Sequence, residues 1–303
     1  MKRAAVVAIA AGAAALLVGG GAAVWWFASR SPGPDVVAGD FLAALAAGDG
    51  ARAATFLEDP PEAAAADALE GAVGLLTDPA VVSIGAVEEG TTRADVAFDL
   101  DGAAQEASFG LVETEGGWRI APDALGALTP TTTIGDALHV GGVLTPASAT
   151  TSLFPAVYDV AAAPSGILAG SATVIVLPGS SQEVAVEASL SPDATASAQE
   201  QIDAYATACA APASTVPENC GIRVPWAADL GALSSIAFRI DAMPVVAFSA
   251  DARTFAATGG VLVATATGTT RDGAAQTVTY RADDWALRGT VAFTGDDMVL
   301  SVD

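Results

Sequence analysis

Residues 93–100 read RADVAFDL, with an apolar side chain at every second position. This period of two predicts a β-strand with one buried face. Three more apolar or alternating runs lie nearby, at residues 81–87, 106–112 and 118–120. Glu-Gly, Asp-Gly and Gly-Gly pairs separate these runs. Because such turns join antiparallel strands, this part of the chain predicts an antiparallel sheet.

Before these strands the pattern is helical. Apolar residues recur at three- and four-residue spacing over residues 35–48, which predicts an amphipathic helix that begins at Asp35. Two further helices are expected at residues 51–57 and 62–76, the first stopped by a Pro-Pro pair and the second by Asp-Pro. Helices followed by an antiparallel sheet predict an α+β domain over residues 35–128.

FLAAL at 41–45, Gly-Asp at 48–49 and GWRI at 117–120, in this order of elements, resemble the NTF2-like (cystatin-like cone) domains that follow the anchor in many actinobacterial envelope proteins. The resemblance implies a long helix across a curved sheet, with room for a pocket. Enzymes of this family typically place an Asp/His or Asp/Tyr pair inside the cone, but residues 35–128 contain neither histidine nor tyrosine.

Three aspartates, Asp95, Asp99 and Asp101, alternate along the strand that follows Arg93. Their spacing places them on one face of the sheet. We interpret this face as the solvated side of an antiparallel sheet. A catalytic or calcium-binding face is the alternative, although calcium needs several more oxygen ligands.

Residues 129–192 predict a small β module. Its expected strands lie at residues 137–143, 156–160, 171–176 and 182–190, separated by Pro, Gly and Ser. SLFPAVYDV at 152–160 resembles the L-F-P-G-x-Y-x-V segment of PEGA-like β modules in bacterial surface proteins, with Ala156 in place of the usual glycine. The resemblance implies a small β-sandwich with an adhesive or spacer role.

Residues 193–303 predict a helix, a cysteine loop and an antiparallel β domain. The helix is expected at 193–208. Short strands are expected at residues 235–240, 245–249, 255–267, 276–281, 291–293 and 298–302. The pairs Asp283-Asp284 and Asp296-Asp297 are interpreted as turn residues, with metal binding as the weaker alternative.

Cys209 and Cys220 are the only cysteines and enclose ten residues. Outside the cytoplasm, so close a pair most simply forms a disulfide. A redox-active pair is the alternative, but the C-x-x-C spacing is absent. We therefore predict a structural disulfide, which would contribute roughly 3 kcal/mol in the chain-entropy model.

The N-terminal segment is expected to be a membrane anchor. Residues 4–27 carry no charge, and as a helix they would span roughly 36 Å, enough for a ~30 Å hydrocarbon core. Lys2 and Arg3 favour a cytoplasmic N-terminus, and the Trp-Trp-Phe run at 25–27 suits the outer headgroups. A signal peptide cleaved near residues 21–23 is the alternative.

This interpretation divides the N-terminal part into a cytoplasmic stub and transmembrane anchor at residues 1–30 and a linker at 31–34. All later residues would lie outside the cytoplasm, on a single-pass protein of the plasma membrane.

Charge and scarce residues narrow the possible functions. The formal net charge is −23, which excludes nucleic acid as a partner and disfavours anionic membrane surfaces. Lys2 is the only lysine, His139 the only histidine and Asn219 the only asparagine. These counts exclude a catalytic lysine in the exported part and a His-rich zinc site. The G-x-S-x-G motif of serine hydrolases is also absent from the sequence.

Three further residues have two possible interpretations. His139 lies in a strand-like setting, where a lone histidine is more often hydrogen-bonded or at the surface than a general base. Trp226 and Trp285 flank β segments and are interpreted as core or edge aromatics. A flat surface that stacks on a polymer is the alternative for both.

The sequence thus predicts an α+β chain with a transmembrane helix, an NTF2-like cone and a mainly antiparallel β region with one disulfide. We expect no catalytic, cofactor-binding or metal-binding residues. The function expected is non-enzymatic interaction or scaffolding in the bacterial cell envelope, with an envelope protein or the cell wall as partner. The alternatives are an NTF2-like domain that binds a small apolar ligand and, less favoured, an enzyme that uses Asp95, Asp99 and His139.

Overall fold

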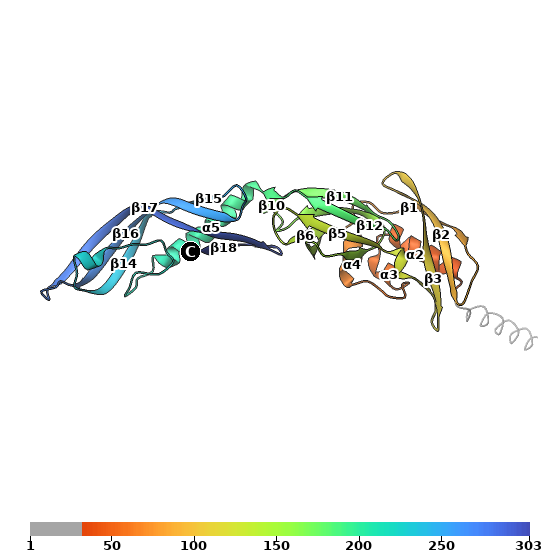
Figure 1. The fold of residues 1–303 in the computed structure, drawn as a ribbon, viewed down its shortest axis with the longest axis horizontal. Helices are drawn as coiled ribbons and strands as arrows, with labels where there is room; N and C mark the ends of the chain where they lie inside the picture. Colours follow the sequence, from red (N-terminus) through yellow and green to blue (C-terminus); the bar gives the residue numbers. More distant parts are fainter. Residues whose placement is uncertain (1–31) are drawn as a thin grey trace, which may run out of the picture.

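The structure is a computed structural model that describes residues 32–303. The predicted anchor at residues 4–27 lies outside the described residues. Within residues 32–303, no helix has both the length and the apolar character needed to cross a membrane. The described chain is a mixed α+β protein with mostly antiparallel strands and one disulfide, as the sequence predicts. Figure 1 shows three bodies that follow one another along the long axis.

The first body places its first helix on one face of a four-stranded antiparallel sheet, and its two shorter helices pack beside that helix and toward the second body. Its helices are α2 (Pro34–Ala46), α3 (Gly50–Ala54) and α4 (Ala63–Glu70). Its strands are β1 (Thr77–Ile84), β2 (Thr91–Leu100), β3 (Ala103–Thr114) and β4 (Gly117–Ile120), paired in chain order. RADVAFDL lies in β2, and its alternate apolar side chains are buried. This buried face packs against α2.

Helix α4 is shorter than predicted. It ends at Glu70, because the next residue, Gly71, lies so close to the Gly141 carbonyl oxygen that a Cβ would overlap it. Val73 N–H then donates to the Val157 carbonyl at 2.9 Å, and Val157 N–H donates to the Gly74 carbonyl at 2.8 Å. The predicted continuation to residue 76 is wrong because these residues pair with the second body.

The second body is a small β-sandwich, reached through the short helix η1 (Pro122–Ala124). Its strands are β5 (Gly126–Thr132), β6 (Ala137–Val140), β7 (Val143–Pro146), β8 (Thr151–Leu153), β9 (Ala156–Ala162), β10 (Leu168–Ala169), β11 (Ser171–Val176), β12 (Ser181–Val186) and β13 (Ser189–Leu190). One sheet has the order β11-β9-β6-β7, the other β12-β5-β8, and β10 pairs with β13. Strands β5 and β12 are parallel.

Two strand predictions in this body are wrong. Residues 137–143 form a hairpin and not one strand, because Gly141 and Gly142 take φ values of 55° and 80° and turn the chain between β6 and β7. Residues 182–190 are divided between β12 and β13.

The third body is a long antiparallel sheet with one helix packed on it. It contains α5 (Pro192–Cys209), η2 (Trp226–Ala228), β14 (Ala232–Ala242), β15 (Val245–Phe248), β16 (Thr254–Thr269), β17 (Ala275–Thr294) and β18 (Asp297–Val302). The strand order is β14-β16-β17-β18, and β15 pairs with the first part of β16. Helix α5 packs against β15 and β18.

Strand β17 corrects another prediction. The expected strands at 276–281 and 291–293 belong to one strand of 20 residues. Asp283 and Asp284 are not turn residues but form a bulge inside it, because Ala282 pairs with Leu262 while Trp285 pairs with Gly260. Asp296 lies in the turn between β17 and β18, as predicted, and Asp297 begins β18.

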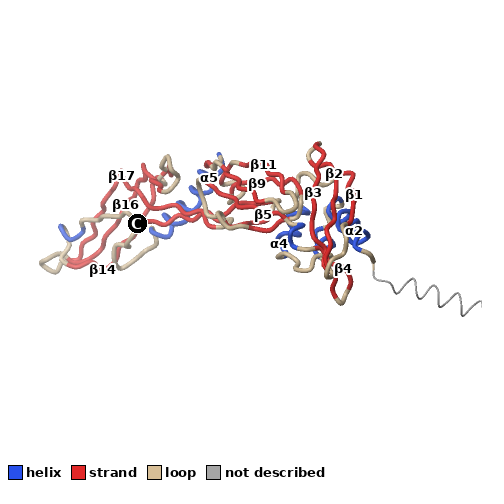
Figure 2. The backbone as a smooth tube through the Cα atoms, turned by 45° about the vertical axis from the view of Figure 1, so that its right-hand side comes forward, coloured by secondary structure: helices blue, strands red, loops and turns tan. Residues whose placement is uncertain are grey.

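The three bodies share a hydrophobic core. One cluster of buried side chains runs from Phe41 through Tyr158 to Phe293, and a separate small cluster around Leu230 and Ile236 lies in the third body. Figure 2 shows the bodies end to end from a second direction. Neighbouring bodies are therefore packed against one another and not merely joined by linkers.

Candidate functional site

The predicted catalytic candidates do not converge. Asp95 is exposed on β2 and its carboxylate accepts a hydrogen bond from Ser83 Oγ at 2.7 Å. Asp101 is exposed in the turn after β2, with φ 53°. His139 lies in β6 of the second body, where its Nε2 is 2.8 Å from Asp296 Oδ1. Asp99, the remaining candidate, is half-buried on β2. Asp95, Asp99 and His139 make no hydrogen bond to one another in the described residues and line none of the five cavities found there with the clearest shape.

The contact of His139 joins two bodies. Asp296 also accepts the backbone N–H of Ser165 at 3.4 Å, and Asp136 accepts the N–H of Gly295 at 2.9 Å. The hydrogen bond with His139 lowers the pKa of Asp296. The turn between β17 and β18 is thus seated on the β-sandwich, and His139 is hydrogen-bonded as the sequence interpretation favoured.

The cone of the first body is filled by its own side chains. Phe41 and Leu45 of α2 are each 1% exposed. The ring of Phe41 meets that of Phe109 edge-on at 5.7 Å and that of Phe154 at 6.4 Å. Five cavities of the described residues have no lining residue from α2. The alternative of a small apolar ligand in the cone gains no support from this packing.

The most developed cavity in residues 32–303 lies in the third body. It is a groove of about 740 Å³, within the usual size range of ligand pockets. We call it the β17 groove. Its lining comes from the segment after the disulfide and from β16 and β17: Gly221 to Pro225, Leu262, Ala264, Thr279 to Ala282, Asp284 to Ala286, and Arg288.

One wall of the β17 groove is the edge of a strand. Strand β16 pairs with residues 275–290 of β17, but β18 reaches only residues 289–294 on the other side. The Arg288 carbonyl accepts the N–H of Asp303 at 3.0 Å, so within the described part of the chain residues 275–287 have one side without a strand partner. Neighbouring residues of both alternations of β17 line the groove, as expected along an edge, and Leu262 and Ala264 of the interior strand β16 show that it also extends over the adjoining face of the sheet.

The direction of the backbone groups follows from the hairpin between β16 and β17. Thr270 N–H donates to the Ala274 carbonyl at 2.8 Å, and the register is regular from there to the Leu262–Ala282 pair. Hydrogen-bonded and non-hydrogen-bonded pairs alternate in such a ladder. The N–H and C=O groups of Thr277, Thr279 and Arg281 consequently point away from β16, toward the open edge.

The opposite wall is the segment that follows Cys220. The disulfide Cys209–Cys220, with an S–S distance of 2.01 Å, ties its start to the end of α5. Trp285 is 2% exposed, and its indole N–H donates to the Cys220 carbonyl at 2.8 Å. Gly221, with φ 59°, lies so close to the Ala286 carbonyl that a Cβ would overlap its oxygen. The base of this wall is therefore fixed from both sides, and the two cysteines form the disulfide predicted.

Within the described residues, the backbone groups of this second wall are also unpaired. No hydrogen bond is made by the N–H or C=O groups from Gly221 to Val224, whereas Cys220 and Pro225 at either side do take part in one. The β17 groove thus has unpaired main-chain donors and acceptors on two opposing walls.

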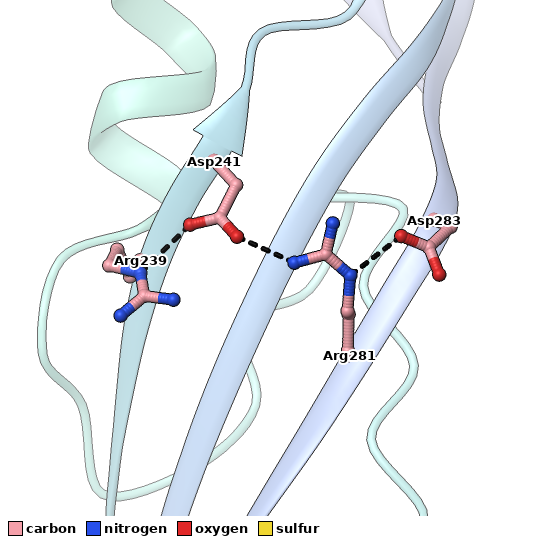
Figure 3. Close-up of polar contacts among 4 residues, drawn as sticks. All are labelled: Arg239, Asp241, Arg281 and Asp283. Atoms are coloured by element: carbon pink, nitrogen blue, oxygen red, sulfur yellow. Dashed lines mark hydrogen bonds and ion pairs between the residues drawn. The ribbon is translucent and has the colours of Figure 1, made fainter.

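Three arginines border the β17 groove: Arg223, Arg281 and Arg288. Arg281 pairs with Asp241 at 2.6 Å and with Asp283 at 2.7 Å, and Arg239 pairs with Asp241 at 2.8 Å, forming the row of charges in Figure 3. Hydrogen bonds from Arg239 and Arg281 lower the pKa of Asp241. In the described chain, the side chains of Arg223 and Arg288 have no hydrogen-bond or ion-pair partner.

Two further polar residues lie at the groove. Asp284 is the only acidic residue in its lining. The hydroxyl of Tyr280 donates to Asp229 Oδ2 at 2.7 Å, which raises the pKa of Tyr280 to about 12. The tyrosine therefore stays neutral at ordinary pH, and the groove is bordered by more positive than negative charge.

Sequence reasoning missed this groove, although one signal was present. Six of the nine arginines beyond Arg30 follow residue 192, in a chain with a large acidic excess. Trp285 is a core aromatic as the sequence interpretation favoured, but its link to Cys220 could not be read from spacing. Within residues 32–303, no group of three or more His, Cys, Asp or Glu side chains is arranged to hold a metal ion. Comparison with protein-family models, curated proteins and solved structures finds no match to this chain.

Proposed function

We propose that this chain is a non-enzymatic interaction or scaffolding protein of the bacterial cell envelope. In this proposal residues 4–27 anchor it in the plasma membrane, with the N-terminus in the cytoplasm and the bulk of the chain outside. The observation that carries the interaction role is the β17 groove, which combines unpaired backbone groups with arginines free of partners. Asp95, Asp99 and His139, the residues of the alternative enzyme hypothesis, line neither this groove nor four further cavities of the described chain.

The families proposed for the first two bodies agree with this role. Three helices followed by a four-stranded antiparallel sheet, with α2 across one face, support an NTF2-like domain. Two small sheets over residues 126–186 support a PEGA-like module that acts as a spacer. Both assignments rest on analogy of fold and carry no activity with them.

The shared core supports a scaffolding role through stiffness. Phe41 of the first body contacts Phe154 of the second, and Asp296 of the third contacts His139 of the second. Relative motion of domains is the ordinary expectation where interfaces are small and polar. Here the hydrophobic cluster is continuous across the bodies, so we expect the chain to hold the groove at a fixed distance from its N-terminal end.

Two measurements on the same cells test the proposed topology. Intact-mass analysis of the membrane fraction should give a chain of all 303 residues. Protease added to intact spheroplasts should digest residues 32–303, while an epitope tag placed before Met1 stays protected. A shortened chain released into the medium, or a protected C-terminal part, would show that the proposed topology is wrong.

A third measurement addresses the interaction role itself. After mild solubilisation of membranes, native electrophoresis should show a discrete species larger than the protein in its detergent micelle. The control is the same chain with Arg223 and Arg288 both changed to glutamate, which should shift material to the smaller species. If the unaltered chain runs only as the detergent-bound monomer, the interaction role loses its support.

A further inference from the structure

We infer that the β17 groove binds an extended acidic peptide segment of a partner protein, which adds as a strand to residues 277–281 of β17 and faces the segment from Ile222 to Val224. This inference rests on the proposed interaction role and names the class of partner. Strand addition to an exposed sheet edge is a recurrent mode of peptide recognition, in which main-chain hydrogen bonds give affinity and alternate side chains give specificity.

The backbone geometry favours a peptide as the occupant. Thr277, Thr279 and Arg281 direct N–H and C=O groups away from β16, and the facing segment has unpaired backbone groups of its own. A peptide offers donors and acceptors on both of its edges at the spacing of a β-strand. A glycan would meet the arginines but would not match these two rows of amide groups.

The lack of the usual edge protection also favours binding of a peptide strand. Proteins usually shield an open strand edge with lysines, proline, a bulge or a covering loop. Residues 275–287 contain no proline and no lysine, and the two irregularities in their pairing with β16 lie beyond Ala282, at Asp283–Asp284 and opposite Ala286. The segment after Cys220 approaches this edge but makes no backbone hydrogen bond to it. The open edge is therefore flanked by a wall and not capped by it.

The charges favour carboxylates on the incoming strand. Arg223 and Arg288 line the groove without partners, and Arg281 has two guanidinium nitrogens already occupied by Asp241 and Asp283. Guanidinium groups pair well with carboxylates, often through two hydrogen bonds. Asp284 opposes this preference at one point of the lining. Because Arg281 is neutralised by its two aspartates, two unpaired positive charges stand against one negative charge, which still favours an acidic segment.

The groove is prepared for an occupant before it binds. The disulfide holds one end of the second wall, and the hydrogen bond from Trp285 to Cys220 holds the same end against the sheet. A site that is already ordered loses less conformational entropy when it binds. Because the walls are fixed, affinity should depend on the arginines and on main-chain pairing more than on rearrangement.

The test uses full-length protein in detergent micelles and a fluorescein-labelled peptide of seven residues that alternates glutamate with valine. Fluorescence anisotropy should show saturable binding that weakens as salt is added, because added ions screen the charges. The same peptide with lysine in place of glutamate should not bind. Absence of binding by the glutamate peptide, or equal binding by the lysine peptide, would overturn the inference.

Two further comparisons separate strand addition from simple charge attraction. A glutamate peptide with N-methyl groups on alternate residues keeps every charge but cannot donate from those positions, and it should bind at least about tenfold more weakly. Polygalacturonate, an anionic glycan, should compete poorly. If the N-methylated peptide or the glycan binds as well as the unmodified peptide, the site recognises charge alone and strand addition is wrong.

Protein variants locate the binding site. Changing Arg223 and Arg288 together to glutamate should weaken peptide binding by at least about tenfold. The matched control is Arg52→Glu, which reverses the charge of another exposed arginine without a side-chain partner in the described chain and lies in the first body. Equal loss in both variants would place the peptide elsewhere. The peptide-binding results do not depend on the membrane assays. A negative result in the peptide assays would therefore overturn strand addition and leave the proposed topology untouched, and the reverse also holds.

Discussion

The first and third bodies both contain an antiparallel sheet with a helix packed on it, but the helix covers a different share of the sheet in each. In the first body α2 covers the sheet and fills the space with Phe41, Leu42 and Leu45, all nearly inaccessible to solvent. In the third body α5 packs only near β15 and β18, and the far half of the sheet is covered by an irregular segment around Trp226. Complete covering of the face leaves a packed core, whereas partial covering leaves room for a groove.

Charge differs between the same two regions. Residues 32–192 contain only three arginines, Arg52, Arg93 and Arg119, among many acidic residues, while six arginines follow residue 192. An acidic surface favours solubility and repels acidic polymers. Residues 193–303 are still acidic overall, with six arginines against 13 acidic residues, so the contrast supports a local positive patch in the third body, as the proposed binding requires.

The largest expected effect tests the filled cone. Phe41→Ala removes a buried ring that meets Phe109 and Phe154. Such substitutions cost about 3–5 kcal/mol, because the cavity they leave closes only partly. Chemical denaturation followed by circular dichroism measures the loss. On the same helix Val36 is 48% exposed, and Val36→Ala should change stability by less than about 0.5 kcal/mol. Similar losses in both variants would mean that the cone is not tightly packed.

A second prediction concerns the disulfide of the third body. Replacing Cys209 and Cys220 together by serine should lower the free energy of unfolding by roughly 2–4 kcal/mol. It should also weaken binding of the glutamate peptide, because the wall after Cys220 loses its fixed end. Hydrogen exchange should then speed up at Trp285 and leave the amides of β2 unchanged. Unchanged hydrogen exchange at the Trp285 amide would show that the disulfide does not hold the groove wall in place.

The third prediction uses two adjacent glycines at the seam between the first two bodies. Gly141 and Gly142 both have positive φ, but a Cβ on Gly141 would overlap the Ala68 carbonyl oxygen, whereas a Cβ on Gly142 meets nothing within 4 Å. Both alanine variants carry the same type of backbone strain, of about 1–3 kcal/mol. Gly141→Ala should therefore be the more destabilising in thermal unfolding. Equal losses of thermal stability in the two variants would show that the close contact between Gly141 and Ala68 does not contribute to stability.

The smallest expected effect lies at the seam between the second and third bodies. The pKa of Asp296 is lowered by the hydrogen bond with His139, so its stabilising contribution is present above the unfolded pKa of about 3.9 and is lost as pH falls below it. Because Asp296 is half exposed, the contribution should stay below about 1 kcal/mol. Asp296→Asn should flatten the loss of stability between pH 4 and pH 2, relative to the unaltered chain. Asp297→Asn on the same turn is the control, and an equal change there would contradict this role of Asp296.

Periodicity predicted the elements that are regular and locally determined. RADVAFDL marked β2, and the helices α2 and α5 begin within one residue of their predicted starts. The disulfide followed from the small separation of two lone cysteines. The class of fold was therefore accessible, because each of these features depends on nearby residues.

The errors arose where distant residues decide the structure. Gly71 ends α4 because Gly141, far along the chain, lies against it. Asp283 and Asp284 resemble turn residues, but pairing with β16 keeps them within a strand. The groove was missed for the same reason, since its walls are separated in sequence and its Arg223 and Arg288 carry no motif. Local patterns cannot report which edge of a sheet is left unpaired.

Strand β17 connects the groove of the third body with the contact between the third and second bodies. Near its middle it forms one wall of the groove, and at its end the turn at Gly295 and Asp296 rests on Asp136 and His139 of the sandwich. At about 3.3 Å per residue, its 20 residues extend over roughly 66 Å. A strand laid along one part of this rod restrains the whole of it. Occupancy of the groove should thus be thermodynamically linked to closure of the distant seam, so that each slows the opening of the other.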